Sequence, residues 1–176
     1  MSINKKDFIA GVCEKYPEEL LKGRIEIEGN VLACAFSDML ILDEVTLDKN
    51  MFISKDGRFY YGLLHNLKQK GFNSLDEVTI LSNSSEGVID KFNELGGYET
   101  ISNMVDVINT SNTDVYMDQL YRENMLCSMY LDGFDLLKKK EIKGKNVIPI
   151  DLFRKMTCEQ VLDYYELQLS GYEVGQ

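Results

Sequence analysis

The stretch ELGGYETISNMVDVINTSNTDVYMDQLYRENML, residues 94–126, shows how the chain is divided into helices. The glycine pair at 96–97 predicts the end of one short helix, because glycine accepts the left-handed backbone that often follows a helix. Apolar residues then recur at helical spacing until a polar break at 109–113, where Asn112 or Thr113 can cap the next helix. This order predicts a short helix, a break and then a long helix.

Apolar residues recur at helical spacing over nearly all of the remaining chain, and no segment alternates clearly at the period of two that a half-buried strand requires. Gly23 is an expected stop between a first and a second helix. Ser74 and Thr157 each stand three residues before a Glu or Gln, the spacing at which the two side chains cap each other at the start of a helix. The sequence therefore predicts an all-α protein.

The longest expected helix runs from about Asp114 to Lys140. Gly144 and Pro149 interrupt the helical period after it, so we expect the chain to turn there and return as a second long helix, which makes a helical hairpin. The short helices before the hairpin are expected to form a compact bundle. The predicted organisation is a helical extension at 1–24, a globular helical subdomain at 25–113, the hairpin at 114–170 and the start of a linker at 171–176.

A narrow apolar stripe follows the long helix in steps of three, four and seven residues, which is typical of a helix that packs against another helix. The second arm of the hairpin, another chain, or both must cover this stripe, because an exposed apolar patch of such length is unusual on a monomer. The residues expected to serve self-association or partner binding on the two arms are Leu120, Cys127, Leu131, Phe134, Tyr164 and Leu169.

The formal net charge of −10 argues against a general nucleic-acid-binding surface, because such surfaces neutralise phosphates with clustered Lys and Arg. We therefore expect weak DNA binding at most. One dense basic run interrupts the acidic composition, either as a solvated helix end, where lysines complement the helix dipole, or as a contact with DNA or an acidic partner. Its lysines are Lys138, Lys139, Lys140, Lys143 and Lys145.

The sequence lacks the residue patterns of the common catalytic and cofactor sites. It contains no G-x-x-x-x-G-K-[ST] phosphate cradle, and its one histidine, His65, has no second His or Cys at metal-ligand spacing. The four widely separated cysteines are expected to be buried free thiols, and the carboxylates have the spacing of solvated helix faces. We therefore expect no catalytic, cofactor-binding or metal-binding residues and no enzymatic activity in this chain.

The sequence also carries no signal for a membrane or for secretion. Its longest apolar stretch, 31–42, is too short to span a bilayer, and the N-terminus has no uninterrupted apolar region behind its basic residues. A cytoplasmic location is expected.

Five short motifs follow one another in the chain. The first, IEIEGNVLA at 25–33, follows the pattern I-E-x-E-x-x-V-L-G with Ala33 at the last position. The second is similar to F…HR.IF, with Gly57 at the histidine position, and the others are similar to G…D.VT with one extra residue, E.GG..YL, and NTPS..N...YA without its proline. The matching residues of these four are Phe52, Arg58, Tyr60, Tyr61, Gly71, Asp76, Val78, Thr79, Glu94, Leu95, Gly96, Gly97, Tyr98, Asn109, Thr110, Asn112 and Tyr116.

In their order and spacing, these motifs resemble the N-terminal domain of DnaB-type replicative DNA helicases, and the resemblance covers about residues 25–131. It implies a non-catalytic domain of the primosome, which acts in DNA replication. The hairpin would be the element through which copies pair into dimers and close into a ring. The neighbouring helices would form a collar that binds the C-terminal domain of a DnaG-type primase and a helicase loader.

Two kinds of protein agree with this resemblance. In the first, the chain is the N-terminal part of an ATP-dependent DNA helicase whose motor follows Gln176. In the second, it is a freestanding phage adaptor or inhibitor that uses a collar-like domain to bind the host helicase or primase. A phosphate-cradle motif downstream of Gln176 in the same gene would favour the first.

Overall fold

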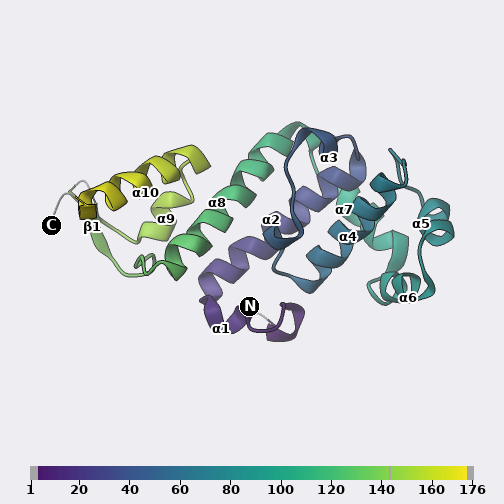
Figure 1. Cartoon of the computed structure of the whole chain (residues 1–176), viewed down its shortest axis with the longest axis horizontal. Helices are drawn as coiled ribbons and strands as arrows, with labels where there is room; N and C mark the ends of the chain where they lie inside the picture. The colour runs from purple at the N-terminus through teal and green to yellow at the C-terminus, as the bar shows by residue number, and fades with distance from the viewer. Residues whose placement is uncertain (1–3, 143, 174–176) are drawn as a thin grey trace.

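The computed structural model describes residues 4–142 and 144–173, except for the side chains of 142, 169 and 171–173, and is helical over most of that length (Figure 1). Its α-helices are α1 (Val12–Lys15), α2 (Glu18–Ser37), α3 (Ile41–Glu44), α4 (Lys55–Gln69), α5 (Glu77–Asn83), α6 (Glu86–Glu94), α7 (Gly97–Val107), α8 (Thr113–Leu131), α9 (Pro149–Phe153) and α10 (Cys158–Glu173). The other described elements are the 3-10 turns η1 (Lys5–Asp7), η2 (Lys49–Met51) and η3 (Thr110–Asn112) and the strands β1 (Lys140–Ile142) and β2 (Lys145–Val147). The predicted all-α class is confirmed.

Helix α2 is central to the fold and packs against α3, α4, α7 and α8 (Figure 1). It follows Pro17, whose fixed φ suits the start of a helix. The expected stop at Gly23 is wrong, because α2 continues to Ser37. A Cβ on Gly23 would lie 2.8 Å from Oε2 of Glu123, so this glycine allows the close approach of α8 instead of ending a helix. The predicted boundary between 24 and 25 therefore lies inside one helix.

Helix α2 contributes to three hydrophobic clusters. The largest lies between its C-terminal half and helices α4 to α8. In the second, Leu20 at the start of α2 packs with the end of α8, with Phe153 of α9 and with α10. The third joins Leu21 to Phe8 and Ile53, so the described part of the N-terminal extension folds onto the rest of the chain.

The glycine pair ends α6 as predicted, since Gly96 and Gly97 have φ angles of 96° and 61° in the left-handed region. The N-cap predicted for the preceding helix is wrong by two residues. Helix α5 is capped by Asp76 instead of Ser74, and Oδ1 of Asp76 accepts a hydrogen bond from the amide of Thr79 at 2.7 Å. A carboxylate at this position satisfies one of the free amides of the first turn.

The polar break before α8 forms the turn η3. Oδ1 of Asn109 accepts a hydrogen bond from the amide of Ser111 at 3.1 Å, which holds the turn. Asn112 occupies the N-cap position of α8, as predicted, although its side chain makes no capping hydrogen bond.

Helix α8 is shorter than predicted, because it ends at Leu131 instead of Lys140. Gly133 follows with a φ of 89°, and the amide of Phe134 donates to the carbonyl of Met129 at 3.0 Å. This left-handed cap satisfies a carbonyl of the last turn and reverses the chain. The apolar stripe suggested a longer helix because Phe134 falls at helical spacing, although it lies beyond the cap.

The connection that follows is more elaborate than the predicted turn. Strands β1 and β2 pair antiparallel around Gly144, which has a φ of 73°, and the short helix α9 comes next. Thr157 and Gln160 then form the predicted reciprocal cap. The amide of Thr157 donates to Oε1 of Gln160 at 3.0 Å, and the amide of Gln160 donates to Oγ1 of Thr157 at 3.2 Å.

Helices α8 and α10 lie against each other, but they run in the same general direction instead of returning as an antiparallel pair (Figure 1). At the start of α10, the amide of Cys158 donates to Oδ1 of Asp118 in the first half of α8 at 2.9 Å. Further along, the hydroxyl of Tyr165 donates to Oδ2 of Asp132, just past the end of α8, at 2.5 Å. The long connection makes this arrangement possible.

Candidate functional site

The predicted self-association residues of α8 differ in their exposure. Leu120 is 0% exposed in the largest cluster, and Cys127 is 4% exposed in the second. Both side chains are therefore covered by this chain itself. Leu131 is 55% exposed, so it is the stripe residue that remains accessible to a partner.

The other predicted residues lie where α8 and α10 meet. The ring of Phe134 packs edge-on against Tyr165 with a centroid distance of 4.9 Å, and Tyr164 lies 5.0 Å from the ring of Phe153. Both aromatic residues are half-buried by intrachain contacts. The side chain of Leu169 lies outside the described residues.

The lysines of the basic run precede and form the β-hairpin. Lys138, Lys139, Lys140 and Lys145 are all exposed, whereas Lys143 lies outside the described residues. Lys138 Nζ is 3.7 Å from Oδ2 of Asp135, an exposed contact that contributes little stability. The described lysines of the run thus lie exposed on and before the β-hairpin, not at the solvated helix end that was one of the two expectations.

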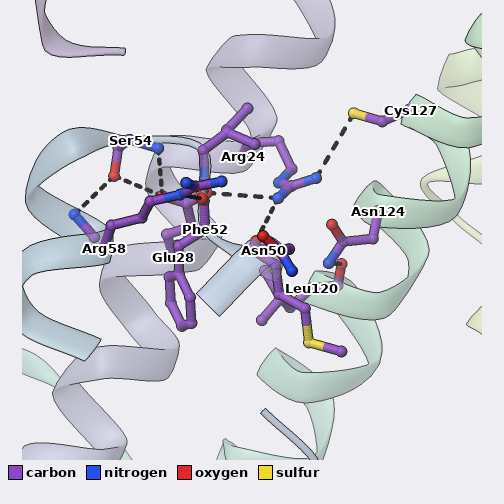
Figure 2. A network of polar contacts seen from close by, with 12 residues as sticks. Arg24, Glu28, Asn50, Phe52, Ser54, Arg58, Leu120, Asn124 and Cys127 are labelled. Carbon is purple, nitrogen blue, oxygen red and sulfur yellow. Dashed lines mark hydrogen bonds and ion pairs between the residues drawn. The ribbon is translucent and has the colours of Figure 1, made fainter. Parts of the chain in front are cut away.

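A network of buried polar side chains connects α2 to the segment before α4 (Figure 2). Arg24 and Glu28 lie one turn apart on α2, are each 1% exposed, and approach to 3.6 Å. The Glu28 carboxylate accepts hydrogen bonds from the amide of Ile53 at 2.6 Å and from the amide and hydroxyl of Ser54 at 3.2 and 2.6 Å. Arg24 also donates to the carbonyl of Met51. The pair therefore fixes residues 51, 53 and 54 of this segment to the interior helix.

Residues from α4 and α8 complete this network. The hydroxyl of Ser54 accepts a hydrogen bond from the amide of Gly57 at 2.9 Å, which caps α4. Nε of Arg58 donates to the carbonyl of Phe52 at 2.8 Å, and Nη1 of Arg24 donates to Sγ of Cys127 at 3.7 Å (Figure 2). A single buried guanidinium thus contacts both the segment before α4 and the face of α8.

Burial raises the pKa of two members of the network. Desolvation raises the pKa of the Glu28 carboxyl, while the hydrogen bonds from Ser54 and Ile53 and the charge of Arg24 act in the opposite direction. Desolvation also raises the pKa of the Cys127 thiol despite the nearby Arg24 guanidinium. Cys127 is therefore held as a protonated thiol, which is the unreactive form.

A second polar network joins α8 to the C-terminal helices. Glu123, 2% exposed, accepts hydrogen bonds from Nε and Nη2 of Arg154 at 2.8 and 2.9 Å, and Nη2 also donates to the carbonyl of Glu19 at 2.9 Å. This hydrogen bonding raises the pKa of Arg154. The neighbouring Arg122 donates to the carbonyl of Met156 at 2.6 Å. The arrangement links α2, α8 and the segment between α9 and α10.

These buried charges were not predicted from the sequence. Arg24 and Glu28 stand at the i,i+4 spacing of a helical ion pair, which is a detectable signal, but most such pairs lie on solvated faces. Arg154 lies 31 residues from Glu123, so no local pattern connects the two. Both networks form hydrogen bonds to main-chain atoms near the ends of helices. Their role is therefore to hold these segments in place.

A groove lies beside α10 in the C-terminal part of the chain. Its volume is about 690 Å³, and its lining residues come from β1, the α9–α10 junction and α10. They are Glu141, Met156, Gln160, Asp163, Tyr164, Leu167 and Gln168. The sequence reading assigned Tyr164 to an apolar face but did not anticipate the groove, because Glu141 arrives from the unpredicted hairpin.

Within residues 4–142 and 144–173, no group of three or more His, Cys, Asp or Glu side chains is arranged to hold a metal ion. The four cysteines are free; Cys34 and Cys127 are buried, and Cys13 and Cys158 are half-buried. No protein-family model, no curated protein and no solved structure matches the chain. In the described part of the chain, none of the helices combines the length and the apolar character that crossing a bilayer requires.

Proposed function

We propose that this chain is the non-catalytic N-terminal domain of a replicative DNA helicase, which associates with copies of itself and binds a DnaG-type primase or a helicase loader. The proposal rests on the helicase-like motifs and on how their residues are connected in space.

The observation that carries the proposal is the contact between the first two motifs. Glu28 of the first motif accepts hydrogen bonds from Ile53 and Ser54, which lie within the second. Arg58 of the second donates back to Phe52 at the start of the same motif. Ile53 and Ser54 stand between the matching residues Phe52 and Arg58, so the contact joins the two motif segments in space. This packing of the two segments supports the proposal.

The distinctive residues of the next two motifs also have definite structural roles. Gly71 of the third motif has a φ of 92° after α4, and Asp76 of the same motif caps α5. Gly96 and Gly97 of the fourth motif both have positive φ angles. Glycine is favoured at a positive φ and aspartate is favoured at an N-cap, so the residue types of the motifs suit the backbone at these positions.

Gly57 departs from the histidine of the second motif, and the structure gives a reason. A Cβ on this residue would lie 2.5 Å from Oγ of Ser54 and 2.6 Å from Oε2 of Glu28. The space that a side chain would need is therefore occupied by the polar network itself.

Size-exclusion chromatography with light scattering tests the proposal, on the chain alone and mixed with the C-terminal domain of the DnaG-type primase from the same source. We expect a dimer or larger assembly alone and a stable complex in the mixture. The same primase without its C-terminal domain is the control and should not bind. A strictly monomeric chain at high micromolar concentration that also fails to bind the primase domain would contradict the proposal.

A further inference from the structure

Two faces of α10 have different surroundings. One face is buried against α8 and α9, where Val161 is 0% exposed and Tyr165 packs on Phe134. The face that lines the groove carries positions 160, 163, 164, 167 and 168, the spacing of a continuous helical stripe. At 1.5 Å per residue this stripe is about 12 Å long, which matches a little more than two turns of a second helix.

Three of the lining residues are apolar or aromatic. Met156 and Tyr164 are half-buried within the groove, and Leu167 is 68% exposed. Leu167 is among the most exposed large apolar side chains of the described residues, and it loses contact with water only if something lies over it. An occupant with apolar side chains would therefore be stabilised here.

The rim of the groove is acidic. Glu141 on β1 and Asp163 on α10 contribute carboxylates, while Gln160 and Gln168 contribute neutral amides. No Lys or Arg is among the lining residues, counting only those that the structure describes, although the exposed Lys140 precedes Glu141 on β1. The sequence of α10 reinforces this polarity, because residues 158–173 contain four Asp and Glu and no Lys or Arg. Charge complementarity favours a cationic occupant and disfavours the phosphates of nucleic acid.

We propose that this groove binds a basic amphipathic helix of a partner protein, with apolar side chains at i, i+3 or i+4 and i+7 over Leu167 and Tyr164 and with Lys or Arg beside Glu141 and Asp163. Helix-in-groove recognition uses this pattern of anchors. The inference goes beyond the proposed function, because the helicase-like motifs include none of the lining residues. Its test requires neither a helicase nor a primase, so either conclusion can fail without the other.

The test is fluorescence anisotropy of a labelled synthetic peptide of about four turns, with leucines on one face and lysines on both flanks, titrated with the whole chain. We expect Leu167→Gln, Asp163→Lys and Glu141→Lys each to weaken binding about tenfold, because each removes an apolar contact or reverses a rim charge. A peptide with glutamates in place of the lysines should not bind. Circular dichroism verifies that the variants keep their helicity.

Matched controls lie on α5, at a distance in sequence and in the fold (Figure 1). Leu81, 37% exposed, and the exposed Glu77 receive the same substitutions, Leu81→Gln and Glu77→Lys, and should leave peptide affinity unchanged. Equal weakening by the α5 variants would show attraction to net charge alone and overturn the proposal. Failure of the basic peptide to bind would overturn it as well. A third result would also overturn the proposal. If the groove variants lower the mass of the assembly in light scattering and the peptide does not compete with this assembly, the groove is occupied by a second copy of the chain.

Discussion

At the scale of single residues, the interior of this protein contains charges whose positions are set by main-chain partners. Arg24 and Glu28 are nearly inaccessible, and Glu28 accepts three hydrogen bonds in addition to the ion pair. A buried pair of this kind adds little net stability, but the loss of one member leaves the other charge uncompensated. Such residues are therefore sensitive positions even though they take no part in chemistry.

Replacement of Glu28 should reveal the direction of its pKa shift. Burial raises the pKa of the folded carboxyl above its ordinary value of 4.5, so the contribution of Glu28 to stability is complete below about pH 4.5 and is lost as the pH rises through the folded pKa. We expect Glu28→Gln to be less stable than the parent, with a difference that narrows as the pH increases. Urea unfolding from pH 4 to pH 8 measures this. A difference that widens with pH would mean that the folded pKa is lowered.

Two glycines of α4 should respond in opposite ways to the same substitution. A Cβ on Gly57 would overlap Ser54 and Glu28, whereas a Cβ on Gly62 has nothing within 4 Å. We expect Gly57→Ala to destabilise the protein by about 1 to 3 kcal/mol through overpacking. Gly62→Ala should stabilise it by about 0.5 to 1 kcal/mol through helix propensity. Urea unfolding of both variants checks this, and equal effects would rule out the close approach at Gly57.

At the scale of elements, the sequence predicted what local chemistry controls and missed what tertiary contacts control. The glycine pair and the Thr157–Gln160 cap were correct because their signals are contained within a few residues. The stop at Gly23 was wrong because that glycine leaves room for the ion pair of Glu123 and Arg154, which lie about 100 and 130 residues away in the sequence. The β-hairpin was missed because three-residue strands are too short to alternate visibly. The candidate groove depends on that hairpin, so it could not be predicted either.

The reciprocal cap of α10 allows a direct test. Thr157→Ala removes the hydroxyl that accepts from the amide of Gln160, and we expect a loss of about 1 kcal/mol in the free energy of unfolding. Thr157→Ser keeps the hydroxyl and is the matched control, expected to retain most of the stability. If Thr157→Ser and Thr157→Ala are equally destabilising, the methyl group of Thr157 contributes to stability and the capping hydrogen bond does not.

Self-association should depend on Leu131 more than on the buried stripe residues. Leu131→Asp introduces a charge at a site that is 55% exposed, so it can weaken a contact between copies without disturbing the core. We expect at least a tenfold weaker association by light scattering, with unchanged helicity. Phe134→Asp should also weaken association, but it disturbs the packing on Tyr165. An unchanged mass for Leu131→Asp would mean that the contact lies elsewhere, and Leu81→Asp on α5 is the control.

At the scale of the whole molecule, the charge is distributed unevenly. The exposed lysines around β1 and β2 project from a chain whose net charge is −10, while the neighbouring α10 is acidic. An acidic body repels phosphate, and one short basic segment offers few contacts to offset that repulsion. The molecule therefore presents a cationic hairpin and an anionic helix beside each other at one end (Figure 1).

Duplex DNA should bind weakly or not at all at physiological salt. We expect any residual affinity to fall as salt increases and to be lost in the double variant Lys139→Ala/Lys140→Ala. The control variant Lys15→Ala/Lys49→Ala removes two exposed lysines outside the run and should have little effect. A filter-binding titration at two salt concentrations makes the comparison. Submicromolar affinity for duplex DNA would contradict the prediction.

Helix α2 is made on the ribosome well before some of its partners in the fold. The contact between Glu19 and Arg154 spans 135 residues, and that between Arg24 and Cys127 spans 103. At roughly 5 to 20 residues per second, α2 waits about 7 to 27 s before Arg154 follows it. During that time Leu20 and Glu19 lack their contacts with Phe153 and Arg154. A nascent chain that stalls or terminates before residue 154 is therefore expected to need a holding chaperone and to aggregate without one.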